Sequence, residues 1–260
     1  MGLHPNHAFL LDSAARLARG RMLDYGCGRG EVVLAGLERG LDVFGADVFY
    51  GGGHGDREHV AENAELHNRV REIANDRLPF PDGYFSLVLH NQVFEHVPDL
   101  DKPLSEIRRV LSDGGVMLSL FPSREVLREG HCGVPLAHRL GRWPNIQYMW
   151  LLAARRCGLG YFHNSKSSRQ WARDFAIWLR SWCYYRPEGV IREAYRRHGF
   201  SFEAHESQYA LFRLEYTGRG WATPAVRTFP RLAEWSIRRL AGLVILSHVE
   251  QGVLGNLAGR

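Results

Sequence analysis

The stretch LDYGCGRGE, residues 23–31, places three glycines at every second position between an apolar run and an amphipathic one. RMLDY at 21–25 predicts a short buried strand, and EVVLAGLERG at 31–40 predicts a helix that ends at Gly40. Glycines at such a turn adopt positive φ and let the backbone approach a ligand. The dinucleotide pattern G-x-G-x-x-G fails at its sixth position, Glu31, and no Gly-Lys-Ser/Thr ending of a phosphate loop follows. We therefore expect the loop to hold an uncharged or cationic part of a nucleoside ligand.

Three further segments extend this strand–turn–helix unit. Residues 41–46 predict a second strand that ends in Asp47, an acidic residue that can accept both ribose hydroxyls of a nucleoside. In LPFPDGYFSLVLHNQVFEHV, residues 78–97, a turn at 81–83 leads into an apolar strand at 84–89. LSEIRRVLSDGGVMLSLFP, residues 104–122, predicts an amphipathic helix, a stop and another strand. This alternation predicts an open α/β sheet whose ligands lie beyond the carboxyl ends of the strands.

These segments resemble the class I S-adenosylmethionine-dependent methyltransferases, in the subgroup related to small-molecule and lipid methylation. The resemblance covers residues 20–122 and rests on the glycine loop, Asp47, the 78–97 block and EIRRVLSDGG at 106–115. It implies S-adenosylmethionine as the cofactor. It also implies an α/β fold with a Rossmann-like, seven-stranded, mostly parallel sheet, a C-terminal β-hairpin and a helical insertion after strand five.

The resemblance further implies which residues hold the cofactor. The methionine end would lie against the loop, in the set Asp24, Gly26, Cys27, Gly28 and Gly30, with Cys27 as a small filler. Asp47 would hold the ribose hydroxyls, Val48 would lie against the adenine, and Asn91 is assigned to the same site. The family often has an aspartate that contacts the adenine amino group where this chain has Ala74. Asn75 or Asp76 would have to replace it.

Composition bears on the compartment and the partners. All but two of the 33 basic residues are arginine, and the net charge is +5. A solvated basic surface accounts for this charge, and an anionic substrate, a membrane surface or RNA would also use it. Nucleic acid is disfavoured because no RNA-binding domain is appended. Four cysteines without a CxxC pair predict reduced thiols in a cytoplasmic protein, and residues 1–20 resemble an amphipathic helix rather than a signal peptide.

The loop SREVLREGHCGVPLAHRLGRWPN, residues 123–145, should leave the sheet directly above the cofactor, where an acceptor must lie. We expect His131 to be the general base, with Glu129 orienting it or binding an acceptor hydroxyl. His96, in NQVFEHV, is the second candidate. His138 is the third, and it is also assigned to acceptor binding together with Arg139. The pattern REGHxGxPxxHR resembles a block in bacterial methyltransferases, some of them encoded near polysaccharide genes.

The residues that follow are unusually aromatic. Residues 136–185 predict a helical, substrate-covering insertion with helices at about 146–157 and 168–183. Its aromatic residues would form the insertion's own core, or a lid that stacks on a sugar ring or an apolar group.

For the C-terminal part we expect the final hairpin in FSFEAHES and QYALFRLEY, residues 200–216, which closes a methyltransferase domain at 1–216. Residues 217–260 would form a basic amphipathic helical extension, with Trp235, Ile237 and Leu240 on its apolar side and Arg238 and Arg239 on its basic side. Such a helix packs on its own domain, on a second subunit in a homodimer, or on the inner face of an anionic membrane as a peripheral contact. The apolar run LAGLVIL is too short to span a bilayer.

The leading functional hypothesis is O-methylation of a saccharide or of a glycan-linked metabolite, as in polysaccharide biosynthesis. A lipid or quinone-like acceptor at a membrane is the alternative within the same class. Outside that class, a non-catalytic subunit that binds S-adenosylmethionine and an RNA-binding protein stay open. The residues HNQ at 90–92 supply no acidic cluster of the kind used in metal-assisted catechol methylation, so we expect no metal.

Overall fold

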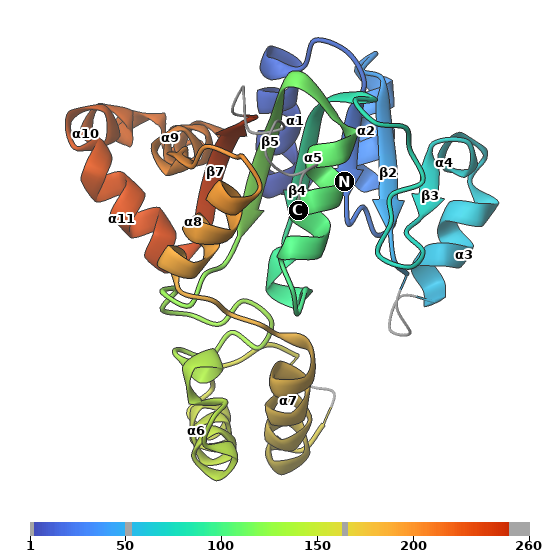
Figure 1. Ribbon diagram of the computed structural model, residues 1–260. Coiled ribbons are helices and arrows are strands. Elements are labelled where there is room, and N and C mark those ends of the chain that lie inside the picture. The colour runs from blue at the N-terminus through green and yellow to red at the C-terminus, as the bar shows by residue number, and fades with distance from the viewer. Residues whose placement is uncertain (1–2, 50–53, 163–165, 250–260) are drawn as a thin grey trace.

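The computed structural model describes residues 3–49, 54–162 and 166–249, which form a seven-stranded sheet with helices around it (Figure 1). The strands are β1 (Met22–Tyr25), β2 (Val43–Asp47), β3 (Val70–Glu72), β4 (Phe85–Asn91), β5 (Leu111–Phe121), β6 (Glu203–Ala204) and β7 (Leu243–His248). Their order across the sheet is β3-β2-β1-β4-β5-β7-β6. The first five strands pair in parallel, and β7 is antiparallel to both β5 and β6. The expected seven-stranded, mostly parallel sheet is therefore confirmed.

Helices cover both faces of this sheet. Those of the main body are α1 (Pro5–Leu17), α2 (Glu31–Glu38), α3 (His54–Glu62), α4 (Ala64–His67), α5 (Asp101–Val110), α8 (Glu188–Arg197), α9 (Glu206–Tyr216), α10 (Thr223–Thr228) and α11 (Pro230–Leu240). Two short 3₁₀ helices lie among them, η1 (Phe94–His96) and η3 (Gly220–Ala222). Helix α2 occupies the predicted 31–40 segment and ends close to the expected Gly40.

The central strands are buried on both faces of the sheet. In β4, Leu87 and Leu89 belong to the core that includes Phe9 of α1, whereas Val88 between them belongs to the core under α5 and α8. Neighbouring residues of a strand point to opposite faces, so each strand supplies both cores in turn. This is why the parallel strands are apolar almost throughout rather than alternating with polar residues.

The chain between β5 and α8 forms a separate helical unit. It contains η2 (Ala137–Leu140), α6 (Pro144–Arg156) and α7 (Ser168–Trp182), and in Figure 1 it lies below the sheet, beyond the carboxyl end of β5. Trp171 is fully buried in a core of its own within this unit. Trp143, Trp150 and Trp182 are instead 40–47% exposed. The helical insertion after strand five is therefore confirmed, and its aromatic residues divide between an internal core and an exposed surface.

The predicted hairpin at 200–216 is wrong in its second arm. Residues Glu206–Tyr216 form helix α9, whose Tyr209 packs edge-on against Phe9 with ring centroids 5.0 Å apart. Short apolar runs fit a strand or a helix equally well, and here contact with α1 decides for the helix. The partner of β6 is β7, which comes from the apolar run at 243–248. That run is continuous because β7 lies between two other strands and is buried on both faces.

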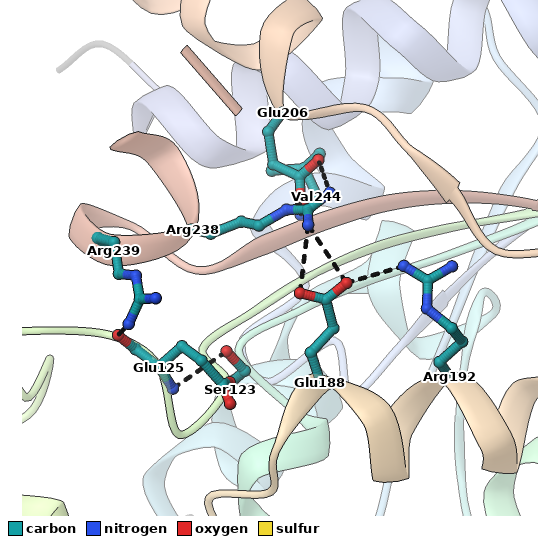
Figure 2. A network of polar contacts seen from close by, with 8 residues as sticks. All are labelled: Ser123, Glu125, Glu188, Arg192, Glu206, Arg238, Arg239 and Val244. Carbon is teal, nitrogen blue, oxygen red and sulfur yellow. Dashed lines mark hydrogen bonds and ion pairs between the residues drawn. The ribbon is translucent and has the colours of Figure 1, made fainter. Parts of the chain in front are cut away.

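The C-terminal segment is consequently part of the sheet and not an added extension, so the domain boundary expected after residue 216 is wrong. Arg238 and Arg239 of this segment also contact other parts of the protein, as Figure 2 shows. The Arg238 guanidinium pairs with the buried Glu206 of α9 at 2.9 Å and with Glu188 of α8 at 3.2 Å. Arg239 donates to the Glu125 carbonyl in the loop after β5 at 3.3 Å. These contacts connect α11 to α9, α8 and that loop, so neither arginine contributes to a free basic face. Residues 250–260 of the expected extension lie outside the described residues.

None of the helices within the described ranges combines the length and apolar character needed to cross a bilayer.

Candidate active site

The glycine loop lies between β1 and α2 and borders two cavities. The larger, of about 360 Å³, is lined by Tyr25, Gly26, Gly28, Asp47, Val48, Phe49, Asp56, Ile73, Gln92, Val93, His96, Val97 and Trp182. The smaller, of about 250 Å³, is lined by His7, Asp24, Gly26, Cys27, Gly28, Arg29, Glu31, Val32 and Asn91. Gly26 and Gly28 line both, so a ligand that filled the two cavities would lie across the loop.

Two of these glycines are required for different reasons. A Cβ atom on Gly26, which has φ +77°, would lie 2.4 Å from a methyl group of Val93. A Cβ on Gly28, which has φ +50°, would meet no atom of the described residues within 4 Å, because it would enter the open cavity. Gly26 therefore allows close packing against the turn after β4, and Gly28 leaves room for a ligand.

Asp47 ends β2 and faces the larger cavity. Its carboxylate accepts hydrogen bonds from the amides of Gly28 at 2.9 Å and Phe49 at 2.8 Å. These bonds fix the carboxylate beside the loop, where its remaining lone pairs can accept hydroxyl donors from a ligand. Val48 follows it with 48% of its surface exposed and also lines the cavity.

Asp24 lies beneath the loop in the smaller cavity and is almost fully buried. Burial, with a further contribution from the charge of Asp47, raises the pKa of Asp24 to about 8. A cationic ligand group would reverse this effect by stabilising the ionised form. Cys27 is buried, and its Sγ lies so close to Gly45 that a Cβ there would come within 2.8 Å of it. Burial raises the pKa of the Cys27 thiol, so this residue is a packing element of the loop.

The remaining residues assigned to the cofactor occupy different places. Asn91 lines the smaller cavity and accepts a hydrogen bond from Asn6 of α1 at 3.2 Å. Asn75 and Asp76 are exposed, and Asp76 pairs with Lys102 at 2.6 Å. Neither of these two lines either cavity, whereas the nearby Ile73 does. Gly30 lies directly before α2 with φ +75° and packs against Leu66.

On the acceptor side, Glu129 is a fully buried carboxylate with four donors. It accepts from the amides of His131 at 2.9 Å and Cys132 at 2.6 Å, from His131 Nδ1 at 2.7 Å and from the Tyr185 hydroxyl at 2.6 Å. Burial disfavours the charge, but the His131 hydrogen bond and charge, Tyr185 and the Cys132 amide outweigh it and lower the pKa of Glu129 to about 2. Glu129 is therefore ionised at neutral pH and fixes the orientation of the His131 ring.

His131 faces His96, and their hydrogen bonds determine the tautomer of each ring. His96 Nδ1 lies 2.7 Å from the Trp182 carbonyl, and His131 Nδ1 lies 2.7 Å from the Glu129 carboxylate. Because a carbonyl and a carboxylate only accept, Nδ1 carries the proton in both rings. The two Nε2 atoms are 3.2 Å apart, and in the neutral rings each directs a lone pair toward the other. The arrangement can therefore hold a positively charged species between the rings.

Glu95, in the 3₁₀ turn η1, was not among the residues selected from the sequence. Its side chain is buried, and neither carboxylate oxygen has a hydrogen-bond partner among the described residues. Burial, and then the charge of Glu129, raise the pKa of Glu95 to about 8. Its apolar neighbours in the sequence gave no signal that it would lie close to His131, which is 36 residues further along the chain.

His138 and Arg139 stabilise the loop after β5 and line neither cavity. His138 Nε2 and Arg139 Nε both donate to the Arg124 carbonyl, at 3.1 and 3.0 Å, and Arg139 Nη2 donates to the Glu125 carbonyl at 3.1 Å. The structure thus brings His131, His96 and Glu129 together. His138 borders this cluster through Tyr185, with ring centroids 4.5 Å apart, whereas Arg139 bonds only to the backbone carbonyls named above. The cavity residues that the sequence reasoning missed include Trp182, which the insertion supplies.

Parts of the chain are similar to known methyltransferases. Residues 23–119 match the family model described as a methyltransferase domain. The chain is 37% identical over 115 residues to the demethylmenaquinone methyltransferase of Thermus thermophilus, covering 43% of this chain and 52% of the relative. It is 31% identical over 99 residues to the malonyl-[acyl-carrier protein] O-methyltransferase of Geobacter sulfurreducens, covering 37% of this chain and 36% of the relative. The matches thus span about half of these relatives or less.

The fold has a counterpart among solved structures. The S-adenosylmethionine-dependent methyltransferase of Mesorhizobium loti superposes with a TM-score of 0.53 and 17% sequence identity, over 92% of this chain and 95% of that one. At this level of identity the likeness concerns the fold. Residues 23–119 thus match a methyltransferase domain, and the chain shares its fold with a solved S-adenosylmethionine-dependent methyltransferase.

Proposed function

We propose that the protein binds S-adenosylmethionine across its glycine loop and transfers the methyl group to a hydroxyl of a small-molecule acceptor, namely a saccharide or a glycan-linked metabolite. The observation that carries this proposal is the position of the His131–His96 pair. His96 lines the cavity that also contains Asp47 and the glycine loop, and Glu129 orients His131 behind it.

The cofactor would be held by residues of three kinds. Gly26 and Gly28 leave the space it needs, Asp47 would accept the ribose hydroxyls, and Asp24 would lie near its cationic methionine end. When bound, S-adenosylmethionine supplies a methyl group on a sulfonium, and the electron pair of the methyl–sulfur bond stays on sulfur after transfer. Val48, Ile73 and Val97 give the larger cavity apolar walls.

The acceptor would enter from the side of the helical insertion. Trp182, at the end of α7, lines the larger cavity, and Trp178 lies 4.8 Å from the His131 ring. Indole faces of this kind stack on sugar rings as well as on apolar groups. A hydroxyl placed against the histidine pair must lose its proton when it is methylated, and a positioned group that assists this loss accelerates such reactions by roughly 10²–10⁴-fold.

A lipid or quinone-like acceptor is the second candidate. It is favoured by the relatives, which include quinone methyltransferases, and by exposed apolar side chains near α10 and α11. Trp221, Leu232 and Leu240 are 61–82% exposed there and would suit a membrane surface. RNA binding and a non-catalytic cofactor-binding role have no comparable support in the site.

Methyl transfer from isotopically labelled S-adenosylmethionine would test the proposal, with panels of saccharides, glycan precursors, quinols and lipids in vesicles. We expect turnover on at least one hydroxyl acceptor, and a loss of about 10²-fold or more in kcat for His131→Ala with cofactor affinity unchanged. Equal turnover in wild type and His131→Ala would refute the role of the histidine pair. Transfer only to acceptors presented in vesicles would favour the second candidate.

A further inference from the structure

We propose that His96, His131 and Glu95 form a site for one divalent transition-metal ion, best matched by zinc, at the edge of the larger cavity. The inference rests on the proposed function and deepens it, because it names what activates the acceptor oxygen. It departs from the expectation of no metal that was based on the residues HNQ at 90–92. Those residues belong to β4 and its end, whereas the ligands proposed here come from the following turn and from a loop far along the chain.

The histidine pair supplies the first argument. Both Nδ1 atoms are committed as donors, to the Trp182 carbonyl and to the Glu129 carboxylate. When both rings are neutral, two Nε2 lone pairs therefore face each other at 3.2 Å, an arrangement that is repulsive in itself and becomes favourable when a cation lies between the rings. Metal-binding histidines usually donate their other ring nitrogen to a carboxylate or a backbone carbonyl, and both acceptors are present here.

The distance between the rings agrees with this assignment. Nitrogen ligands at 2.0–2.1 Å from one tetrahedral zinc ion lie about 3.3–3.4 Å from each other. The observed separation of 3.2 Å is close to this value.

Glu95 supplies the second, independent argument. Its carboxylate is buried and has no hydrogen-bond partner among the described residues, which is costly unless a ligand satisfies it. One of its oxygens and one ring nitrogen from each histidine lie within 4.8 Å of one another. Two imidazoles and one carboxylate are a ligand set of catalytic zinc sites, which keep a fourth position open.

A second group, Glu129, His131 and Cys183, satisfies the same distance limit but does not fit a metal. The Glu129 carboxylate is already saturated by four donors, and the His131 nitrogen next to it carries a proton. Burial raises the pKa of the Cys183 thiol to above its usual range, which disfavours the thiolate that a metal would need. The site is therefore on the Nε2 side of His131, toward His96 and the cavity.

The open position gives the ion a chemical role. An acceptor hydroxyl that binds there loses its proton to water, because coordination lowers the pKa of a bound O–H group. The oxygen remains on the ion as an alkoxide and then takes the methyl group, and the neutral ether dissociates from the ion. In this metal-assisted reaction the two histidines act as metal ligands, and Glu129 acts by holding His131 in the correct tautomer.

The test is metal binding by the full chain, measured without turnover. Protein stripped with a chelator is titrated with Zn²⁺ by calorimetry and with Co²⁺ by visible absorption, which reports tetrahedral coordination. We expect one ion per chain, at least tenfold weaker binding in Glu95→Gln, and loss of the site in His131→Ala. His67→Ala, which changes an exposed histidine on α4, is the matched control and should bind as wild type. Thermal unfolding verifies that each variant is folded.

The outcomes separate the inference from the proposed function. If S-adenosylhomocysteine binds the stripped protein but no stoichiometric Zn²⁺ site is found, or if Glu95→Gln binds Zn²⁺ as wild type does, the metal site is overturned, and a proton shared by the two rings replaces it. If S-adenosylhomocysteine binds neither form, the proposed function fails, and the zinc titration still decides the site by itself.

Discussion

Asp24 beneath the glycine loop and Glu129 in the loop after β5 are both buried carboxylates, yet their pKa values move in opposite directions, to about 8 and about 2. Glu129 accepts hydrogen bonds from two amides, a ring nitrogen and a hydroxyl. No donor among the described residues reaches Asp24, and the charge of Asp47 opposes its ionisation. The fold therefore satisfies Glu129 by itself and leaves Asp24 to be satisfied by a ligand. Glu129 holds the surrounding groups in place, and we expect Asp24 to pair with a cationic group of a bound ligand.

Among the substitutions considered, we expect a change at Glu129 to have the largest effect on the stability of the fold. Glu129→Gln keeps the shape of the side chain but replaces one accepting oxygen by a donor that faces other donors. We expect the free energy of unfolding to fall by about 3 kcal/mol, measured by urea denaturation at pH 7. Glu203→Gln, at an exposed carboxylate, is the control and should change stability by less than about 0.5 kcal/mol. A Glu129→Gln protein as stable as wild type would contradict the anchoring role.

The lowered pKa of Glu129 also predicts how the stability of the fold changes at acidic pH. The folded pKa of Glu129, about 2, lies below its ordinary value of 4.5. Its contribution is therefore present above pH 4.5 and is lost as the pH falls toward 2. The difference in melting temperature between wild type and Glu129→Gln should narrow over this interval. A difference that stays constant from pH 6 to pH 2.5 would show that the charge of Glu129 is not the cause.

Asp24 should affect the pH dependence of stability in the opposite direction. Its folded pKa, about 8, lies above its ordinary value of 3.8, so the stability that protonated Asp24 contributes is fully present below pH 3.8 and is lost as the pH rises through 8. Asp24→Asn removes this loss, and we expect it to stabilise the ligand-free protein by about 1–2 kcal/mol at pH 8.5. It should also weaken S-adenosylhomocysteine binding at least tenfold. Lower stability together with unchanged affinity would refute the assignment of Asp24 to the ligand.

The smallest effect is expected at the turn where the family often has its adenine contact. Asp76 is exposed, pairs with Lys102 and lines neither cavity. An exposed ion pair contributes at most about 1 kcal/mol to stability. Asp76→Ala should therefore leave cofactor affinity within about twofold of wild type. Loss of affinity beyond tenfold would mean that the turn at 74–77 closes over the adenine when the cofactor binds.

The features that could be predicted from the sequence are those formed by residues close together in the chain. The glycine loop, Asp47 and strands β1, β2 and β4 depend on backbone geometry within short segments, and their residues are close together in the chain. The cluster of Glu95, His96 and His131 forms because η1 contacts a loop 35 residues further along the chain. No local sequence pattern predicts such a contact. The run at 243–248 was misread because a strand buried on both faces has no alternation, and α9 was misread because 11 residues are too few to separate the two periods.

The central claim is that the glycine loop and Asp47 hold S-adenosylmethionine, and calorimetric titration tests it most directly. S-adenosylmethionine and S-adenosylhomocysteine are titrated into wild type, Asp47→Ala and the control Asp76→Ala. We expect one site per chain with affinity on the order of micromolar in wild type and Asp76→Ala, and at least tenfold weaker binding in Asp47→Ala. Absence of binding in wild type, or equal binding in all three proteins, would contradict it.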